Sequence, residues 1–500
     1  MSLRRNVMAN YVGQGWTALM GIAFLPFYAK LVGMEEYGLV GVFAILQSWM
    51  TLLDLGLTPT LNREMARLRA GAHTGDSIRD LLRSLETLYV VLAAIMIGLI
   101  ILAAPWLTRS WLQYDSVPSD VVTHSIRVMA FVLAARWLEL IYRGALQGLQ
   151  DLVWLNAAQI ALATARWGGA YGMLLAFPSI EVFFAWQGAI SALSVAVFAW
   201  RTYRILPQPT RRAVFAWSAL LEVRSFAVGM FLSSMLTFLL TQADKLVISK
   251  QLSLTALGAY TLAANAANGL LQLVIPMNAA VYPRLTQHVT GSDEAQLANT
   301  YKLSCEWMAA VIVPPALVMA FFARPFMLSW TGNPSLADSV TPLLAPLVLG
   351  TLCNGLMNIP YMLQLAHGWT SLSVKVNLVA VIIMVPAIVW AVARFGAVGA
   401  AYAWLSLNAA SLLVTSQLMY RRLLPHFKSD WYVTAVGQPL AAGLVSAALL
   451  RWWIPAPSGR VQAILVTLLA GLIVGGAVVW SLPAVRDVIL RHRRTVQSRG

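Results

Sequence analysis

Residues 85–108 read LETLYVVLAAIMIGLIILAAPWLT, a run in which Glu86 is the only charged side chain. A helix that crosses a lipid bilayer needs about 20 consecutive, mostly apolar residues, so this stretch is long enough to span one. The rest of the chain has the same character, because 59% of its 500 residues are hydrophobic and only 11% are charged. A soluble fold of this size cannot bury so much apolar surface. The composition therefore predicts an all-α integral membrane protein.

Apolar stretches of similar length recur from one end of the chain to the other and predict about fourteen transmembrane helices. We expect these helices near residues 9–32, 37–60, 85–108, 121–148, 153–176, 181–203, 226–249, 256–282, 303–323, 341–366, 371–393, 397–420, 433–453 and 461–482. The connections between them are short. The two longest, near 62–84 and 204–225, are basic and amphipathic, and we expect them to lie against anionic lipid.

Lysine and arginine gather in every second connection, which sets the orientation of the helices. With the N-terminus in the cytoplasm, the inner connections and the C-terminal tail hold about three times as many of these residues as the outer ones. The outer connections hold only Lys30, Arg109, Lys250, Arg324, Arg394, Arg451 and Arg460. We therefore expect both termini in the cytoplasm. The net charge of +15 follows from this topology and does not indicate nucleic-acid binding.

A weak internal repeat divides the chain. Tyr37-Gly38 opens the second predicted helix and Gly258-Ala259-Tyr260 lies in the eighth, and the offset of about 220 residues also relates the ends of these two helices. Six helices per repeat predict two parallel lobes related by a pseudo-two-fold axis along the membrane normal, with a cavity between them. The expected organisation is an N-lobe over 1–206, a basic cytoplasmic connection over 207–225, a C-lobe over 226–424, and two further helices with a basic tail over 425–500.

Several short motifs lie along the chain in a specific order and spacing. They are Asn10-Tyr11-Val12 with Tyr28-Ala29, Leu53-Asp54-Leu55-Gly56-Leu57, Gln242-Ala243-Asp244-Lys245-Leu246, Leu257-Gly258-Ala259-Tyr260 and Tyr282-Pro283-Arg284. In this order and spacing they resemble the motifs of the polysaccharide (Wzx-type) flippase family of the MOP superfamily. The resemblance implies a two-lobed, V-shaped transporter of the bacterial cytoplasmic membrane. It implies that a polyprenyl-pyrophosphate-linked oligosaccharide, such as an O-antigen, exopolysaccharide or capsule repeat unit, moves from the cytoplasmic to the periplasmic leaflet by alternating access. The expected partners are this lipid-linked oligosaccharide, membrane lipids, and a polysaccharide polymerase with other glycan-assembly proteins, and we expect a monomer.

Two transporters of the same superfamily stay open as alternatives, a lipid II flippase and a MATE-like, cation-coupled drug antiporter. A glycan polymerase or ligase would need acid, base or donor-binding residues outside the membrane. The outer connections are short and poor in His, Glu and Asp, so we do not expect an enzyme. The two cysteines, Cys305 and Cys353, indicate neither a disulfide framework nor a metal site. No P-loop is present, and we expect no cofactor.

Charged residues inside two neighbouring helices are the candidate binding site, because charge at membrane depth is costly and marks function. The helix over 121–148 contains Arg127, Arg136, Glu139 and Arg143, and the next helix contains Arg166. In a hairpin of the two helices, Arg136 and Arg166 lie at one depth, about 20 Å from the turn. Either Glu139 neutralises this pair permanently, or it leaves net positive charge for a pyrophosphate that arginine grips bidentately.

The other two arginines of this helix have open roles. Arg143 lies close to the inner surface and beside Glu139, which favours a structural ion pair over substrate binding. Arg127 points the other way and is nearer the outer end, so it either snorkels to the surface or lines the outer cavity.

Three further charged residues complete the candidates. Asp54 binds a coupling proton or sodium ion, or it hydrogen-bonds to the chain at a Pro/Gly distortion, and we favour the second interpretation. By the resemblance, Asp244 organises the lobe or couples to an ion, and Lys245 faces the cavity.

Two pairs of glycines have the small-xxx-small spacing, Gly144 with Gly148 and Gly471 with Gly475. This spacing removes side-chain bulk from one face of a helix and lets a neighbouring helix approach closely. We expect each pair to mark such a contact.

Overall fold

The computed structural model describes residues 3–54, 57–69, 74–208, 210–215, 235, 239–291, 293–369, 371–483 and 485–487. The chain forms two compact units, Met1–Gly258 (unit 1) and Ala259–Gly500 (unit 2). In the described residues there is no strand, and an isolated bridge joins Gln113 to Ser253.

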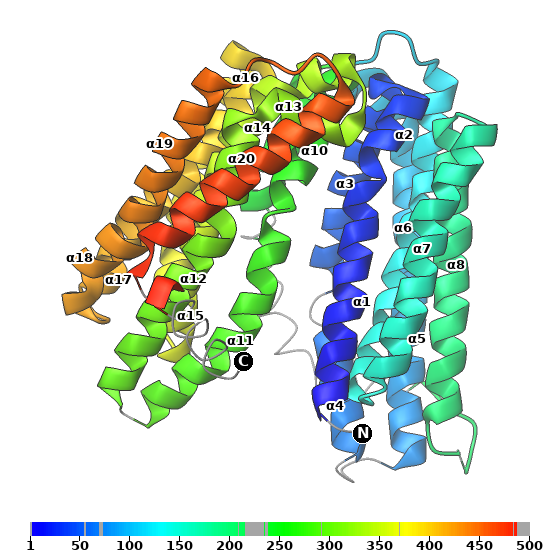
Figure 1. The fold of residues 1–500 in the computed structure, drawn as a ribbon. Helices are drawn as coiled ribbons and strands as arrows, with labels where there is room; N and C mark the ends of the chain where they lie inside the picture. The colour runs from blue at the N-terminus through cyan, green and yellow to red at the C-terminus, as the bar shows by residue number, and fades with distance from the viewer. Residues whose placement is uncertain are drawn as a thin grey trace, which may run out of the picture. The chain divides into compact units, whose positions relative to one another are not determined.

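Unit 1 is built around one central helix. Its elements are α1 (Leu3–Ala23), α2 (Leu25–Val32), α3 (Met34–Leu53), α4 (Leu57–Arg69), α5 (Gly75–Trp106), α6 (Ser119–Gly148), α7 (Leu152–Ala176), α8 (Ile180–Ile205), a helix over 239–251 and the start of α10 (Leu254–Asn268). Helix α6 packs against α3, α4, α5 and α8, while α7 packs against α1 and α8. The long helices of this unit run side by side (Figure 1). Charged residues on α6 therefore face protein on several sides.

Unit 2 contains the second set of long helices. Its elements are the rest of α10, then α11 (Leu271–Thr290), α12 (Glu294–Phe321), α13 (Ala323–Thr331), α14 (Pro334–Leu356), α15 (Asn358–Ala366), α16 (Ser371–Ala410), α17 (Ser416–Tyr420), α18 (Lys428–Asp430), α19 (Gln438–Trp453) and α20 (Arg460–Ser481). Helix α12 occupies the centre and packs against α11, α14, α19 and α20. Helix α16 lies along α14.

The predicted helices match the observed ones closely. Of the fourteen predicted segments, twelve are traced from end to end. In 226–249, residues 226–234 and 236–238 lie outside the described residues, and in 37–60, residues 55 and 56 do. By length and composition, nine spans in the described part of the chain are able to cross a membrane. The total of fourteen stays a prediction, and the protein is a multi-pass membrane protein.

Four predicted helices are interrupted where the sequence indicated one continuous span. The helix predicted over 9–32 divides into α1 and α2, and that over 37–60 into α3 and α4. The helix predicted over 256–282 divides into α10 and α11, and that over 341–366 into α14 and α15 at Met357. Conversely, α16 covers two predicted helices, and the turn between them falls at Gly396, whose backbone is non-helical with φ 63° and ψ −150°. A side chain at this φ would be strained, so the turn falls at a glycine.

The described parts of the two long inner connections include helical and hydrogen-bonded segments. Helix α5 begins at Gly75 through a capping box between Thr74 and Ser77, so much of 62–84 is helix and not a connection. The start of the second connection is held on α5, because Arg79 Nε donates to the Pro207 carbonyl oxygen at 3.0 Å. The contact of these segments with lipid stays a prediction.

The boundary between the units differs from the predicted lobe boundary. Residues up to Gly258 group with unit 1 because the backbone N–H of Leu254 donates to the Gln113 carbonyl oxygen at 2.7 Å and Gly258 packs on Met34. Residues 216–234 of the predicted boundary region lie outside the described residues. The four predicted segments therefore stay a prediction.

A reciprocal contact agrees with the internal repeat. A Cβ atom on Gly38 would overlap the Leu254 carbonyl oxygen, and a Cβ atom on Gly258 would overlap the Met34 carbonyl oxygen. Residues 34 and 38 correspond to 254 and 258 at the repeat offset of about 220 residues, so each segment contacts the other in the same way. This is the pattern expected of two segments related by a two-fold axis.

Only one of the two glycine pairs marks a close helix contact. A Cβ atom at Gly144 would meet the Thr58 methyl group at 2.8 Å, and one at Gly148 would overlap the Asn62 carbonyl oxygen, so α6 lies directly against α4. By contrast, nothing described lies within 4 Å of a Cβ atom at Gly471, and Gly475 meets only Pro314, at 4.0 Å. The second expectation was wrong, because at Gly471 and Gly475 no described helix approaches closely enough to require a glycine.

Candidate functional site

Arg136 is held by neutral groups. It extends from α6, its two terminal nitrogens donate to Gln47 Oε1 on α3 and to Gln187 Oε1 on α8, each at 2.7 Å, and its guanidinium lies 5.0 Å from the centre of the Phe43 ring. No carboxylate among the described residues forms an ion pair with it. Its Nε has no hydrogen-bond acceptor. Amides fix the orientation of the guanidinium without neutralising its charge.

Arg166 is neutralised, unlike Arg136. Its Nη2 donates to Glu139 Oε2 at 3.0 Å and to Ser194 Oγ on α8 at 3.1 Å. Glu139 is buried, and its other oxygen lies 3.7 Å from Arg143, whose side chain is 38% exposed. The structure therefore brings these predicted residues together around one carboxylate.

The cluster as a whole has surplus positive charge and surplus donors. Glu139 is the single carboxylate beside Arg136, Arg143 and Arg166, and it pairs with Arg143 and Arg166 but not with Arg136. Arg136 still lies within electrostatic reach of both Arg166 and Glu139. Three buried donor nitrogens have no acceptor, namely Nε of Arg136, Nε of Arg166 and Nε2 of Gln187. Unsatisfied donors of this kind are rare in native proteins. The arrangement is suited to an anion with several oxygen acceptors.

Arg127 lies outside this cluster. Its side chain is exposed, and it has no hydrogen-bond or ion-pair partner in the described part of the chain. Both predicted interpretations, snorkelling and lining an outer cavity, fit an exposed side chain, so its role stays a prediction.

Asp54 lies between α3 and α4 and accepts hydrogen bonds at this break. Thr58 Oγ1 donates to it at 2.6 Å, the hydroxyl of Tyr89 also donates to it, and the Thr58 N–H is 3.4 Å from its second oxygen. Tyr89 is fully buried and stacks on Trp137 with ring centres 4.4 Å apart. This geometry agrees with the favoured structural interpretation, while a role in ion coupling stays a prediction.

Lys245 and Asp244 are separate from the arginine cluster. Lys245 is buried, and its ammonium lies 3.3 Å from Gln242 Oε1, one turn earlier in the same helix. The Asp244 carboxylate accepts from the backbone N–H of Lys245 at 2.7 Å. The hydrogen bond from Lys245 to Gln242 lies within one helix, and a cavity-facing Lys245 stays a prediction.

Sequence reasoning missed the neutral side chains of the site. Gln47, Gln187 and Ser194 each contact an arginine of the cluster, and the Gln159 amide accepts from Arg143 in the orientation that satisfies its hydrogen bonds. A search for charged residues passes over them. The available signal was their polarity, since a glutamine within an apolar helix needs a polar partner.

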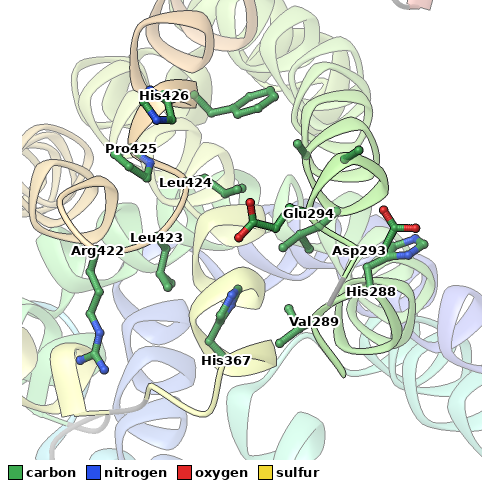
Figure 2. Close-up of a pocket in the computed structure, with 14 residues that line it drawn as sticks. His288, Val289, Asp293, Glu294, His367, Arg422, Leu423, Leu424, Pro425 and His426 are labelled. Atoms are coloured by element: carbon green, nitrogen blue, oxygen red, sulfur yellow. The ribbon is translucent and has the colours of Figure 1, made fainter. Parts of the chain in front are cut away.

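A separate pocket of about 750 Å³ lies within unit 2, between the start of α12, the end of α15 and the segment after α17. Three imidazoles line it, those of His288, His367 and His426, together with Asp293 and Glu294. Glu294 and His367 point into this pocket (Figure 2). No group of these side chains in the described residues is arranged to hold a metal ion. None of the predicted site residues lines it.

Comparison with protein families identifies the chain. Residues 3–289, more than half of its length, match the polysaccharide biosynthesis protein family. The chain belongs to this family. The matched residues cover unit 1 from residue 3 to its end and continue into unit 2. Residues 230–390 also match the MatE family, which overlaps this region and extends through much of unit 2.

Curated relatives of this polysaccharide biosynthesis family member are named as transporters. A putative O-antigen transporter of Shigella flexneri is 20% identical over 423 residues, which is 85% of this chain and 99% of that protein. The succinoglycan biosynthesis transport protein ExoT of Rhizobium meliloti is 23% identical over 491 residues, 93% of this chain and 90% of the relative.

Solved structures confirm the predicted fold class. The lipid II flippase MurJ in an inward closed conformation superposes with a TM-score of 0.72 at 11% identity, covering 96% of this chain and 99% of MurJ. An inward-facing MATE transporter of the MOP superfamily superposes with a TM-score of 0.66 at 14% identity, over 82% of this chain and 95% of the transporter. This member of the polysaccharide biosynthesis protein family thus has the MOP superfamily fold.

Proposed function

We propose that the protein is a flippase that translocates a polyprenyl-pyrophosphate-linked oligosaccharide from the cytoplasmic to the periplasmic leaflet by alternating access. The names of its relatives support a glycan repeat unit, of O-antigen or exopolysaccharide type, as the cargo. Both relatives are named for transport, which supports a transporter and not an enzyme.

The observation that carries this proposal is the surplus of unsatisfied donors around Arg136. Its charge has no ion-pair partner among the described residues, and its Nε and the Gln187 Nε2 have no acceptor. A partly buried cation without an ion-pair partner is costly, so a ligand that supplies negative oxygens would be bound favourably there. A pyrophosphate has such oxygens, and the planar guanidinium matches their geometry.

The two alternative transporters differ from the proposed flippase in the cargo that they carry. A cationic drug would be repelled by three arginines with one carboxylate beside them, so the site disfavours a drug antiporter. A lipid II flippase handles a similar lipid pyrophosphate, and the fold of MurJ is shared. The curated relatives, which are named for O-antigen and succinoglycan, favour the polysaccharide repeat unit over lipid II.

The cellular setting belongs to the proposal as well. We place the chain as a monomer in the bacterial cytoplasmic membrane with both termini in the cytoplasm, next to a polymerase and other glycan-assembly proteins. Transport draws on a proton or sodium gradient, with Asp244 and Asp54 as the coupling candidates.

A flipping assay tests the function. Purified protein in lipid vesicles is given a defined lipid-linked oligosaccharide under imposed ion gradients, and its appearance in the opposite leaflet is measured. Loss of charge-assisted hydrogen bonds should lower the rate of Arg136→Ala by about ten- to hundredfold, because each is worth about 1.5–3 kcal/mol. Arg136→Lys should recover the rate only in part, since an ammonium lacks the planar fork.

The control is Arg204→Ala, which removes an exposed arginine that stacks on Trp200 outside the cluster and should leave the rate unchanged. Full activity of Arg136→Ala would disprove the role of Arg136. A wild-type protein that moves a cationic drug but no lipid-linked glycan would favour the antiporter.

A further inference from the structure

Four asparagine residues of unit 2 form a hydrogen-bonded row. Asn278 Nδ2 on α11 donates to Asn358 Oδ1 on α15 at 2.8 Å, and Asn358 Nδ2 donates to the Asn354 carbonyl oxygen at 2.9 Å. Asn354 Nδ2 on α14 then donates to Asn408 Oδ1 on α16 at 3.0 Å. Four amides thus join four helices, and no charged side chain takes part in these bonds.

The row of asparagines ends at Asn278 on a hydrogen-bond acceptor that has no donor. Asn278 Oδ1 is buried and has no hydrogen-bond donor. The arginine cluster of unit 1 has the opposite property, because its unsatisfied atoms are donors. Unit 2 therefore offers a neutral site that is complementary to a hydroxyl donor, and a free carbonyl oxygen of this kind would repel a phosphate oxygen.

Two helix interruptions frame these amides. Helix α10 ends at Asn268 and α11 begins at Leu271, while α14 ends at Leu356 and α15 begins at Asn358. Helices α11 and α15 pack against each other, so the two segments that follow the breaks are neighbours. In transporters, substrate sites are typically built from such interrupted helices, because their free backbone groups need a polar, water-lined setting.

Exposed aromatic rings accompany the amides on both helices. Tyr282 follows Asn278 by one turn on α11 and is 39% exposed, and Tyr361 follows Asn358 by one turn on α15 and is 40% exposed. At 1.5 Å per residue, the rings lie about 6 Å and about 4.5 Å further along their helices. An exposed ring offers an apolar face for the C–H side of a sugar, while a neighbouring amide binds its hydroxyls.

We propose that Asn278, Asn358, Tyr282 and Tyr361 form a saccharide-binding surface in unit 2 that recognises the glycan of the cargo. This inference rests on the proposed function, since it names the part of unit 2 that would bind the neutral sugars of the cargo. The saccharide-binding surface would make binding specific for one glycan. The arginine cluster would bind the pyrophosphate whichever glycan is attached.

Equilibrium binding to two probes tests the surface. The probes are a complete lipid-linked repeat unit and the same polyprenyl pyrophosphate without sugar, each titrated into the purified chain in lipid nanodiscs. The wild type should bind the glycan-bearing probe more tightly. Loss of a hydrogen bond or of one stacking ring should weaken that probe by about tenfold in Asn278→Ala and in Tyr361→Ala, with the sugar-free probe unchanged.

Two further variants separate binding from folding. Tyr361→Phe keeps the ring and should keep the preference for the glycan. Tyr402→Ala removes a tyrosine on α16 that is 56% exposed, and it should bind both probes as the wild type does. Because Tyr361 is exposed and has no described polar partner, Tyr361→Ala is expected to fold.

Each outcome decides the inference. Equal binding of the two probes by the wild type, an unchanged preference in both Asn278→Ala and Tyr361→Ala, or an equal loss for both probes would overturn the saccharide surface. If the wild type moves no lipid-linked glycan in vesicles, the proposed function fails instead. Arg136→Ala should weaken both probes, which distinguishes the two sites.

Discussion

Arg136 and Arg166 carry the same charge on neighbouring helices, yet their surroundings differ. Arg166 donates to the Glu139 carboxylate, whereas Arg136 donates to the Gln47 and Gln187 amides. Amides orient a guanidinium but cannot cancel its charge, so Arg136 retains the greater capacity to bind an anion. From the sequence alone the two arginines are equivalent candidates. Only their partners in the structure distinguish them.

The ion pairs of Glu139 differ in burial, and their contributions to stability should differ accordingly. The side chain of Arg166 is 17% exposed, while that of Arg143 is 38% exposed and lies further from the carboxylate, at 3.7 Å against 3.0 Å. Removing Arg166 leaves a buried charge without its main partner, which costs about 3–5 kcal/mol. Removing a partly exposed partner costs about 1 kcal/mol or less.

We therefore expect Arg166→Ala to lower the thermal unfolding temperature in detergent much more than Arg143→Ala does. The double variant Arg166→Ala with Glu139→Gln should recover part of the loss, because no buried charge is then left alone. An equal effect of the two single variants would contradict this difference between the pairs.

Helices as elements followed from the sequence, but their interruptions did not. The length of the apolar stretches predicted where the long helices lie, but α5 and α12 begin well before the predicted starts of 85 and 303. The breaks between α10 and α11 and between α14 and α15 were missed, because a hydropathy pattern continues through an interruption that is satisfied by polar neighbours. At the second break, Asn358 Nδ2 donates to the Asn354 carbonyl oxygen, and the side chain of Asn358 also accepts from Asn278 on α11.

The two glycine pairs lead to a prediction about helix contacts. Gly148→Ala places a methyl group against the Asn62 backbone and Met65 on α4, and overpacking of this kind costs about 1–3 kcal/mol. Gly471→Ala meets no described atom within 4 Å, and alanine favours a helix over glycine by about 1 kcal/mol.

Thermal unfolding of the purified variants should therefore show a lower midpoint for Gly148→Ala and an equal or higher one for Gly471→Ala. Glycine-to-alanine changes in the same spacing motif would then shift the unfolding temperature in opposite directions. A loss of stability in Gly471→Ala would indicate that its face is covered by a helix after all.

At the scale of the whole molecule, the contact between Gly38 and Gly258 joins two segments that are one repeat apart. Each glycine faces a backbone carbonyl of the other segment, that of Leu254 or that of Met34. Because the two positions make one shared contact, Gly38→Ala and Gly258→Ala should destabilise by similar amounts, about 1–3 kcal/mol each. Their combined effect should be less than the sum, as expected for coupled positions.

Denaturation of the two single variants and the double variant measures this coupling. Gly98→Ala on α5 is the matched control, because nothing described lies within 4 Å of its Cβ position. Strong destabilisation by one glycine variant and none by the other would show that the contact is not symmetric, and it would weaken the case for the repeat.

The sequence alone predicted that lipid surrounds most of this protein, and it indicated what kind of cargo to consider. Apolar stretches of membrane length and the bias of basic residues are local properties of the chain, so they predict helices and orientation without any contact. The arginines within two helices were visible in the same way, because charge at membrane depth stands out against an apolar background.

Only the tertiary structure decided which charges are neutralised, which polar groups are left unsatisfied and which glycines meet a neighbour. Glu139 with Arg166, Gln187 with Arg136, and Asn278 with Asn358 each join separate helices. Pairing of this kind depends on distances between elements, which no spacing within one helix encodes. Hydrophobicity therefore fixed the membrane fold, and packing fixed where its few polar groups can bind.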